Sequence, residues 1–337
     1  MSFHLPDIHR DWPFPRADNP HYVEVASESV RWIESFKLFP TDRQRSFHAI
    51  LPGLLGSMAY PNLSRAHFRT ACDLMNILFA VDDISDRLNP TEAKVIADAM
   101  LDALRNPEKE RDITEHRLAD LVRSFWARAL ETASSTTIRR FIRSYEDYVC
   151  AMTQEAQDRQ YKSVRKSMDE YLDLRRYTGA IKPSLDLILL PLEISDKLLD
   201  SPTVKELEMI AIELIAVAND IVSFNVEQAR GDIHNLVIVL MDGDKKMTVQ
   251  TAMDLVGQWY RKRGQDFVEG LKRLPSVDDG NYEVLCLHQY AWGLGNWVTA
   301  NYEWSFESHR FFGEENGEVM KHRVVKLLPK APPLVTV

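Results

Sequence analysis

The chain has 337 residues, of which 45% are hydrophobic and 27% charged, and its formal net charge is −9 at pH 7. This length and composition allow a substantial buried core, so a disordered or fibrous chain is excluded. An acidic chain is also a poor nucleic-acid binder, because neutralising phosphates requires clustered Lys and Arg. The three cysteines are far apart and follow no metal-ligand spacing, which indicates free thiols in a reducing, cytoplasmic compartment.

The first 20 residues are rich in proline and aromatic side chains and predict an extended N-terminal arm. The arm lacks the apolar stretch of a secretory signal, and no apolar run reaches the ~20 residues needed to cross a bilayer. We therefore expect a cytoplasmic protein without a membrane span.

Helical spacing of apolar residues runs through most of the remaining chain. It predicts helices over 22–36, 42–57 with a break at Pro52, 63–88, 91–104, 117–132, 137–158, 161–177, 182–190, 202–229, 245–271 and 282–312. Strand-like alternation is rare, so residues 21–327 predict one all-α domain. The three prolines in 328–337 predict a flexible C-terminal tail.

An acidic motif closes one of these apolar runs. Asp82, Asp83 and Asp86 directly follow residues 74–81, and on a helix Asp82 and Asp86 share a face. Three carboxylates this close repel one another, and a hard cation such as Mg²⁺ would relieve that repulsion. A simple acidic helix end explains the motif equally well, so it decides nothing alone.

A second polar row follows another apolar run. Asn219, Ser223 and Glu227 are spaced four and four, so on a helix they form one stripe. An amide oxygen, a hydroxyl and a carboxylate in a row are plausible ligands for a hard metal, although an exposed polar stripe has the same spacing. If the two rows face each other across a bundle, they can hold Mg²⁺ and an anion such as diphosphate.

Two arginines have places suited to such an anion. Arg175 precedes a helix break at Gly179, where backbone groups become free, and Arg310 lies near the C-terminus. Each is, by itself, more often a surface residue or an ion-pair partner.

As a set, these motifs resemble those of class I terpene synthases, most closely the sesquiterpene cyclases of mushroom-forming fungi. The resemblance extends from the Trp12-Pro13 arm to Arg310. It implies an all-α, single-domain class I terpenoid synthase helical bundle with a central active-site cavity. It also implies a lyase that ionises farnesyl diphosphate with three Mg²⁺ ions. The resulting cation would become a sesquiterpene hydrocarbon or alcohol, with release of diphosphate.

The resemblance also implies roles for individual residues. It implies metal ligands at Asp82, Asp86, Asn219, Ser223 and Glu227. It implies diphosphate contacts for Arg175 and Arg310, with Asp83 bonding to such arginines. Gly179 matches the position whose carbonyl faces the forming cation, and Arg176 remains an alternative to Arg175.

Aromatic side chains supply candidates for the pocket wall. Phe79 lies three residues before Asp82 and is expected to line the pocket beneath the metal. Trp297 and Trp304 share a helix face and suit either the pocket or the core, and Gly293 on that face would leave room for a ligand. His234 receives no catalytic role.

Two positions depart from the family pattern. Phe311 stands where Tyr is usual, and Val226 where many relatives have Lys, so one hydroxyl and one basic contact are absent unless Arg230 compensates.

Other functions remain open at this point. One alternative is a synthase that uses geranyl diphosphate as its substrate, or that quenches its cation early to a linear alcohol of the linalool or nerolidol type. A prenyltransferase is disfavoured because the second motif is not aspartate-rich. A non-catalytic helical interaction protein is the alternative from another class. We expect a small-molecule prenyl diphosphate as the only substrate partner, and a monomer or homodimer.

Overall fold

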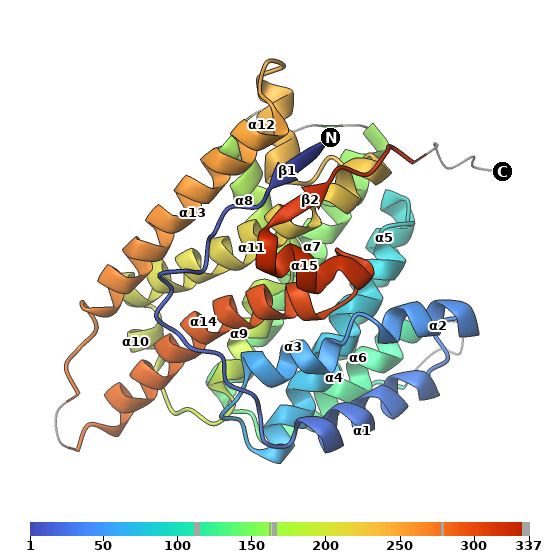
Figure 1. Ribbon diagram of the computed structural model, residues 1–337. Helices are drawn as coiled ribbons and strands as arrows, with labels where there is room; N and C mark the ends of the chain where they lie inside the picture. Colours follow the sequence, from blue (N-terminus) through green and yellow to red (C-terminus); the bar gives the residue numbers. More distant parts are fainter. Residues whose placement is uncertain (111–114, 162, 164–166, 278–279, 332–337) are drawn as a thin grey trace.

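The computed structural model describes the chain except for residues 111–114, 162, 164–166, 278–279 and 332–337 (Figure 1). Nearly all the regular secondary structure of the described chain is helical, which confirms the all-α prediction. The longer helices are α1 (Tyr22–Ser35), α4 (Arg65–Ser85), α5 (Pro90–Arg105), α6 (Arg117–Leu130), α7 (Ser135–Tyr161), α8 (Met168–Thr178), α11 (Pro202–Arg230), α13 (Val249–Leu271) and α14 (Tyr282–Glu307). The shorter ones are α2 (Thr41–His48), α3 (Pro52–Ala59), α9 (Ile181–Asp186), η1 (Leu187–Leu189), α10 (Asp196–Leu199), α12 (Leu236–Gly243), η2 (Gly313–Glu315) and α15 (Asn316–His322).

Helix α11 is the central element of the bundle and packs against α8, α9, α12, α13 and α14 (Figure 1). It begins with Pro202 at its first turn and ends at Gly231, whose φ of 86° only glycine adopts without strain. Its length and apolar composition alone would suit a membrane span, but 83% of its most apolar window is buried inside the protein. Its apolar side chains therefore form the core around which the other helices pack.

Helix α4 carries the acidic motif on its last turns. Ser64 caps its start by accepting from the His67 amide at 3.4 Å, and the helix runs to Ser85. The next helix begins with a capping box formed by Asn89 and Glu92, which fixes where the intervening turn ends. The three aspartates therefore lie at a helix end whose position is set on both sides.

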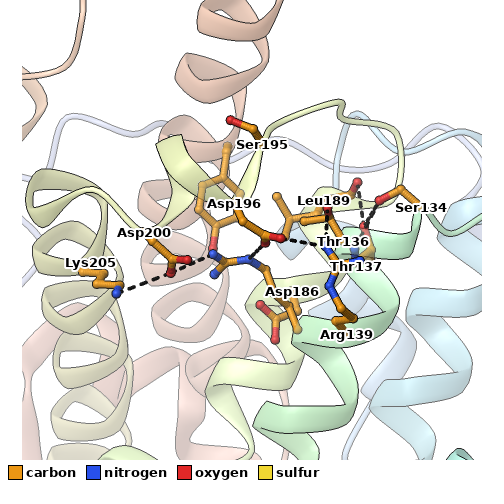
Figure 2. A network of polar contacts seen from close by, with 12 residues as sticks. Ser134, Thr136, Thr137, Arg139, Asp186, Leu189, Ser195, Asp196, Asp200 and Lys205 are labelled. Atoms are coloured by element: carbon orange, nitrogen blue, oxygen red, sulfur yellow. Dashed lines mark hydrogen bonds and ion pairs between the residues drawn. The ribbon is translucent and has the colours of Figure 1, made fainter.

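A polar network ties α7 to the segment that leads into α11 (Figure 2). Arg139 donates to Asp196 at 2.6 Å, and Arg140 donates to Asp200 at 2.9 Å. Thr137 Oγ1 also donates to the Leu189 carbonyl at 3.4 Å. These contacts lie near the start of α11, roughly 30 Å along the helix from Ser223. They fix the helix at the end far from the polar row.

Two short strands join the ends of the chain, and the sequence pattern did not predict them. β1 (Ser2–His4) pairs antiparallel with β2 (Val324–Lys326), with Phe3 opposite Val325. The expected limits of the arm (1–20), the helical domain (21–327) and the tail (328–337) stay predictions. In the described part of the tail the Leu328 amide donates to Asn225 at 2.9 Å, and residues 332–337 lie outside the described chain.

Two helix limits differ from those expected from periodicity. Of the helix expected over 161–177, residue Tyr161 belongs to the end of α7, and α8 begins at Met168, where Ser167 caps it by accepting from the Glu170 amide at 3.2 Å. Residues 162 and 164–166 of that expectation lie outside the described chain. The helix expected to reach 312 ends at Glu307, because Ser308 adopts an extended backbone. The second difference matters, since it places Arg310 in a turn rather than on a helix.

The N-terminal arm packs along α14. Trp12 Nε1 donates to the Gly295 carbonyl at 3.1 Å, and a Cβ at Gly295 would lie only 2.3 Å from the Phe14 ring. His9 stacks on Tyr302, with ring centroids 4.4 Å apart. Burial lowers the pKa of His9 to about 4, with a smaller opposing contribution from Asp7.

This pKa predicts an acid sensitivity of the folded arm. Between pH 6.5 and 4 the unfolded chain takes up a proton that folded His9 excludes, so stability present at neutral pH is lost as the pH falls. His9→Phe keeps a ring against Tyr302 but removes this linkage. The variant should lose about 1–3 kcal/mol less unfolding free energy than wild type between pH 7 and 4.5. Denaturant unfolding at several pH values measures this, and parallel pH profiles would contradict it.

Candidate functional site

The acidic motif and two members of the second polar row line one cavity of about 520 Å³, whereas Asn219 is not among its lining residues. Asp82, Asp83 and Asp86 reach it from the end of α4, while Ser223 and Glu227 reach it from the last turns of α11. The turn after α14 and the helix α2 complete the wall. The structure thus brings together two motifs that are far apart in the sequence.

Each of the first two aspartates is paired with an arginine. Arg310 donates to Asp82 Oδ2 at 2.7 Å. Arg43 of α2 donates to Asp83 Oδ2 at 2.6 Å and to the Asp83 carbonyl at 2.7 Å. Arg43 was not singled out from the sequence, because nothing in the chain around it marks its partner. Both arginines line the cavity, so they lie where an incoming anion would compete with the aspartates.

Asp86 lines the cavity, and its surroundings disfavour the ionised form of its carboxyl group. Desolvation by the surrounding protein, followed by the charge of Asp82, raises its pKa to about 6, while Arg159 and Arg310 oppose the shift. A carboxyl held near its charged neighbour in this way gains stability from a nearby cation. This supports the interpretation of the acidic motif as a cation site.

The start of the second row is bound to a buried arginine. Arg175 Nη2 donates to Asn219 Oδ1 at 2.9 Å, and its Nε donates to Asp220 Oδ1 at 3.1 Å. Burial lowers the pKa of Arg175, but Asp220 and Tyr171 raise it, and the balance lies above its ordinary value. Tyr171 itself donates to Asp220 Oδ2 at 2.7 Å. Arg175 is therefore a fixed positive charge beside Asn219.

Arg176, the alternative to Arg175, points elsewhere. Its guanidinium donates to Glu213 at 2.7 Å, and Arg263 of α13 pairs with the same carboxylate. This pairing links α8, α11 and α13 and directs Arg176 away from Asn219. The geometry favours Arg175 as the arginine of the site.

Asn235 joins the second row from outside it. Its Nδ2 donates to the Asp220 carbonyl at 2.7 Å, to Glu227 Oε2 at 2.9 Å and to Ser223 Oγ at 3.4 Å. Its Oδ1 accepts from the Val237 amide at 2.9 Å and caps α12. The residue is fully buried. The sequence carried the signal for the cap, an Asn before an apolar helix, but no signal for the donor role.

Glu227 is the titratable member of the row, and its pKa is raised. Burial and then the charge of Asp220 raise its pKa to about 7, while the hydrogen bond from Asn235 and the charge of Arg175 lower it. Asn235 therefore favours the ionised carboxylate and holds it toward Ser223. Both effects are in the direction that cation binding at Glu227 would require.

The donor set suits a hard divalent cation. It offers amide, hydroxyl and carboxylate oxygens on α11 and carboxylates on α4, which are the ligands Mg²⁺ prefers. Within the described residues, no group of three or more His, Cys, Asp or Glu is gathered to hold a metal. Asn219 and Asp82 accept from Arg175 and Arg310 instead. Direct ligation would require these two arginines to turn toward another anion.

The helix break beside Arg175 is also formed. Arg175 Nη1 donates to Thr178 Oγ1 at 3.3 Å, and α8 ends at that residue. The positive φ of 52° falls on Ala180 rather than on Gly179. Four residues after Gly179 stands Pro183, which has no N–H to donate to the Gly179 carbonyl. The sequence thus leaves this carbonyl without the usual helical partner.

The aromatic candidates Phe79, Trp297 and Trp304 are not among the residues that line the cavity. The Phe79 ring lies 5.2 Å from Trp304 and 5.2 Å below the Arg310 guanidinium, so it connects the acidic motif to the last long helix. Trp297 packs edge-on against Tyr60, with centroids 5.4 Å apart. A pocket role for Phe79 stays a prediction.

The expectation that Gly293 leaves room for a ligand is wrong. A Cβ there would lie 2.7 Å from Ile188, so the glycine permits close packing of α14 on η1. The spacing from Trp297 correctly places Gly293 on the same face of the helix, but at Gly293 this face packs against Ile188 and leaves no space for a ligand.

The departures at Phe311 and Val226 lie in the cavity wall. Arg230 and Arg87 line the same cavity. Arg230 is therefore placed to supply the basic contact that Val226 lacks, and Arg87 is a further charge that the sequence did not indicate. The Phe311 ring lies 5.7 Å from the Arg310 guanidinium and supports that arginine by a cation–π contact.

An all-helical bundle with opposed oxygen-rich rows and four arginines around one cavity is suited to binding a metal-bound anion. A family model described as terpene synthase family 2, C-terminal metal binding, matches residues 73–266. The Delta(6)-protoilludene synthase of Stereum hirsutum is 37% identical over 97% of this chain and 88% of its own. Sesquiterpene synthase 9 of Postia placenta is 40% identical over 99% of this chain and 96% of its own.

Solved structures show the same fold. That of α-eudesmol synthase has a TM-score of 0.79 at 21% identity, covering 88% of this chain and 98% of the other. Hedycaryol synthase in complex with HEPES has a TM-score of 0.76 at 22% identity, covering 90% and 98%. The chain belongs to the terpene synthase family. This confirms the resemblance drawn from the motifs and, through the metal-binding description of the family, supports the use of a divalent metal.

The position of Asn235 predicts that its amide controls the metal row. Asn235→Asp keeps an oxygen to cap α12 but replaces the donor Nδ2 with a second acceptor facing Glu227. Activity at limiting Mg²⁺ should fall about 10- to 100-fold, as for other residues that orient metal ligands. The rate of product formation against Mg²⁺ concentration measures this.

Asn89→Asp is the matched control. Asn89 caps α5 in the same way, by accepting from the Thr91 and Glu92 amides at 3.0 Å, but it is exposed and is not among the residues that line the cavity. Its Mg²⁺ profile should match wild type. Equal profiles for both variants would contradict the role of Asn235.

Proposed function

We propose that this protein is a Mg²⁺-dependent sesquiterpene synthase that ionises farnesyl diphosphate and converts the cation to a sesquiterpene hydrocarbon or alcohol. One observation carries the proposal, namely that the Asp82 motif and the Ser223–Glu227 row line a single cavity with Arg310. The relatives named for sesquiterpene and protoilludene synthesis support the C15 substrate.

The residues of this chain have distinct tasks in the proposed reaction. Asp82, Asn219, Ser223 and Glu227 would hold the metal, with Asp86 as a further acidic ligand. Bound Mg²⁺ would supply positive charge that stabilises the departing diphosphate. We infer three ions from the family alone.

Arg175 and Arg310 would bind the diphosphate oxygens as negative charge grows on the leaving group. The Arg310 guanidinium already lies at the cavity, over the Phe79 ring, and the Arg175 guanidinium is held beside Asn219 by Asp220 and Thr178. Such preorganised charge lowers the barrier to ionisation because it needs little rearrangement. Asp83 would take part through Arg43, its partner in the structure.

The carbocation formed in the reaction needs an apolar pocket from which water is excluded. The face of the Phe79 ring would stabilise the carbocation by a cation–π interaction, which is worth ~1–2 kcal/mol when water is excluded. The Gly179 carbonyl, which lacks a helical partner from Pro183, would direct a partial negative charge at the cation. Dry surroundings also prevent early capture by water.

Two further assignments belong to the proposal. A cytoplasmic location rests on the free thiols of Cys72, Cys150 and Cys286. A monomeric or homodimeric state is expected from the family resemblance.

Product analysis tests the reaction directly. Purified protein is incubated with Mg²⁺ and, separately, with geranyl, farnesyl and geranylgeranyl diphosphate, and products are analysed by gas chromatography. We expect a cyclic C15 product from farnesyl diphosphate, release of diphosphate, and loss of both with a chelator. A linear alcohol, or turnover of the C10 substrate alone, would replace the main proposal by its alternative. Absence of diphosphate release from every substrate would contradict the enzyme assignment.

The arginine pair supplies matched variants for this assay. Arg175→Ala removes the guanidinium beside Asn219 and should lower kcat/KM about 100-fold or more. Arg176→Ala removes the adjacent guanidinium that pairs with Glu213. It should lower stability while leaving kcat/KM close to wild type. The reverse order of effects would reassign the diphosphate contact to Arg176.

A further inference from the structure

The paired ends of the chain form a small clasp, defined here as residues 2–5 and 324–331. Strand β1 pairs with β2, and the Leu5 amide donates to the Arg323 carbonyl at 2.8 Å. Phe3 and Val325 lie opposite each other and are both buried. Figure 1 shows β1 and β2 side by side across the bundle, with the two strand colours from opposite ends of the sequence.

The clasp is bonded to α11 between two proposed metal ligands. Asn225 Nδ2 donates to the Lys326 carbonyl at 2.9 Å, and Asn225 Oδ1 accepts from the Leu328 amide at 2.9 Å. The side chain thus bonds the clasp backbone as a neighbouring strand would. Asn225 is buried, with 6% of its surface exposed.

Further contacts follow the same face of α11. Gln228 Nε2 donates to the Leu328 carbonyl at 2.9 Å, and the Ala331 amide donates to the Ala229 carbonyl at 2.6 Å. The Phe3 ring meets Phe224 edge-on, with centroids 5.5 Å apart. The clasp therefore holds the last two turns of α11 through side chains and backbone.

Helix geometry sets these contacts behind the metal row. Ser223 and Glu227 are four residues apart and both line the cavity. Asn225 is two residues from each, so its side chain leaves the helix on the far side. Cavity and clasp consequently hold the same two turns from opposite sides.

We propose that the clasp positions the metal-binding turns of α11, and that Asn225 is its positioning residue. Ser223 and Glu227 lie close to the end of α11, where a helix frays most easily. Hydrogen bonds from Asn225 to the clasp hold these turns in place while Ser223 and Glu227 bind the cation on the opposite face of the helix. This inference rests on the proposed metal site and extends it to the two ends of the chain.

The clasp is itself anchored outside the site. Gln250 of α13 accepts from the His4 amide at 2.8 Å and donates to the His4 carbonyl at 3.3 Å. Gln250 thus makes the same kind of two-bond amide contact with the clasp as Asn225, but from a helix that carries no proposed ligand. It is a matched control for Asn225.

The test measures binding without turnover. Thermal unfolding of the full chain is followed in inorganic diphosphate while Mg²⁺ is titrated, and the Mg²⁺ concentration at half-maximal stabilisation is recorded. Asn225→Ala should raise this concentration about fivefold, in the direction seen when residues behind metal ligands are removed. Gln250→Ala should leave it within about twofold of wild type, even where it lowers the melting temperature equally.

A second variant keeps the test independent of changes in α11. Phe3→Ala removes the ring that packs on Phe224 and should shift the Mg²⁺ midpoint in the same direction as Asn225→Ala. Stabilisation of the wild type with no shift in either variant, or with an equal shift in Gln250→Ala, would overturn the positioning role alone. Absence of Mg²⁺-dependent stabilisation in the wild type would overturn the metal site and this inference together.

Discussion

The pairing of Arg310 and Arg175 with acidic and amide oxygens is the interaction on which the proposed site depends. Carboxylates of α4 and α11 lie in a partly buried space. Burial, followed by the charge of Asp82, raises the pKa of Asp86 to about 6, and burial, followed by the charge of Asp220, raises the pKa of Glu227 to about 7. Arg310 compensates Asp82, and Arg175 compensates Asp220 while holding Asn219. The protein therefore folds with the positive charges of its anion site bonded to the oxygens of its proposed cation site.

This arrangement explains why metal and diphosphate would be expected to bind together. A cation alone would have to compete with Arg310 for Asp82, and diphosphate alone would have to draw Arg310 away and leave the carboxylate unpaired. When the cation and diphosphate bind together, the cation pairs with Asp82 and the diphosphate pairs with Arg310, so neither side chain is left without a partner. The rest of the fold serves that exchange, because the long helices position the two oxygen rows while Asn235 and the clasp hold the last turns of α11.

Much of this organisation could be predicted from the chain. Helical periodicity gave the bundle, and the four-residue spacing of Asn219, Ser223 and Glu227 placed them on one face. The features that could not be predicted from the sequence depend on tertiary contacts. Arg43 meets Asp83 only because the fold brings the Arg43 side chain of α2 to the end of α4. The donor role of Asn235 needs the turn that returns α12 to α11. The strands β1 and β2 are three residues each and have meaning only when the chain ends meet.

The most direct measurement is a crystal structure of the protein with Mg²⁺ and inorganic diphosphate. The account predicts that Asp82, Asn219, Ser223 and Glu227 bind metal, and that Arg175 and Arg310 leave Asn219 and Asp82 to contact diphosphate. The Arg310–Asp82 bond of 2.7 Å would then be broken. A complex in which both arginine pairs persist while diphosphate binds elsewhere would contradict the exchange and the proposed site.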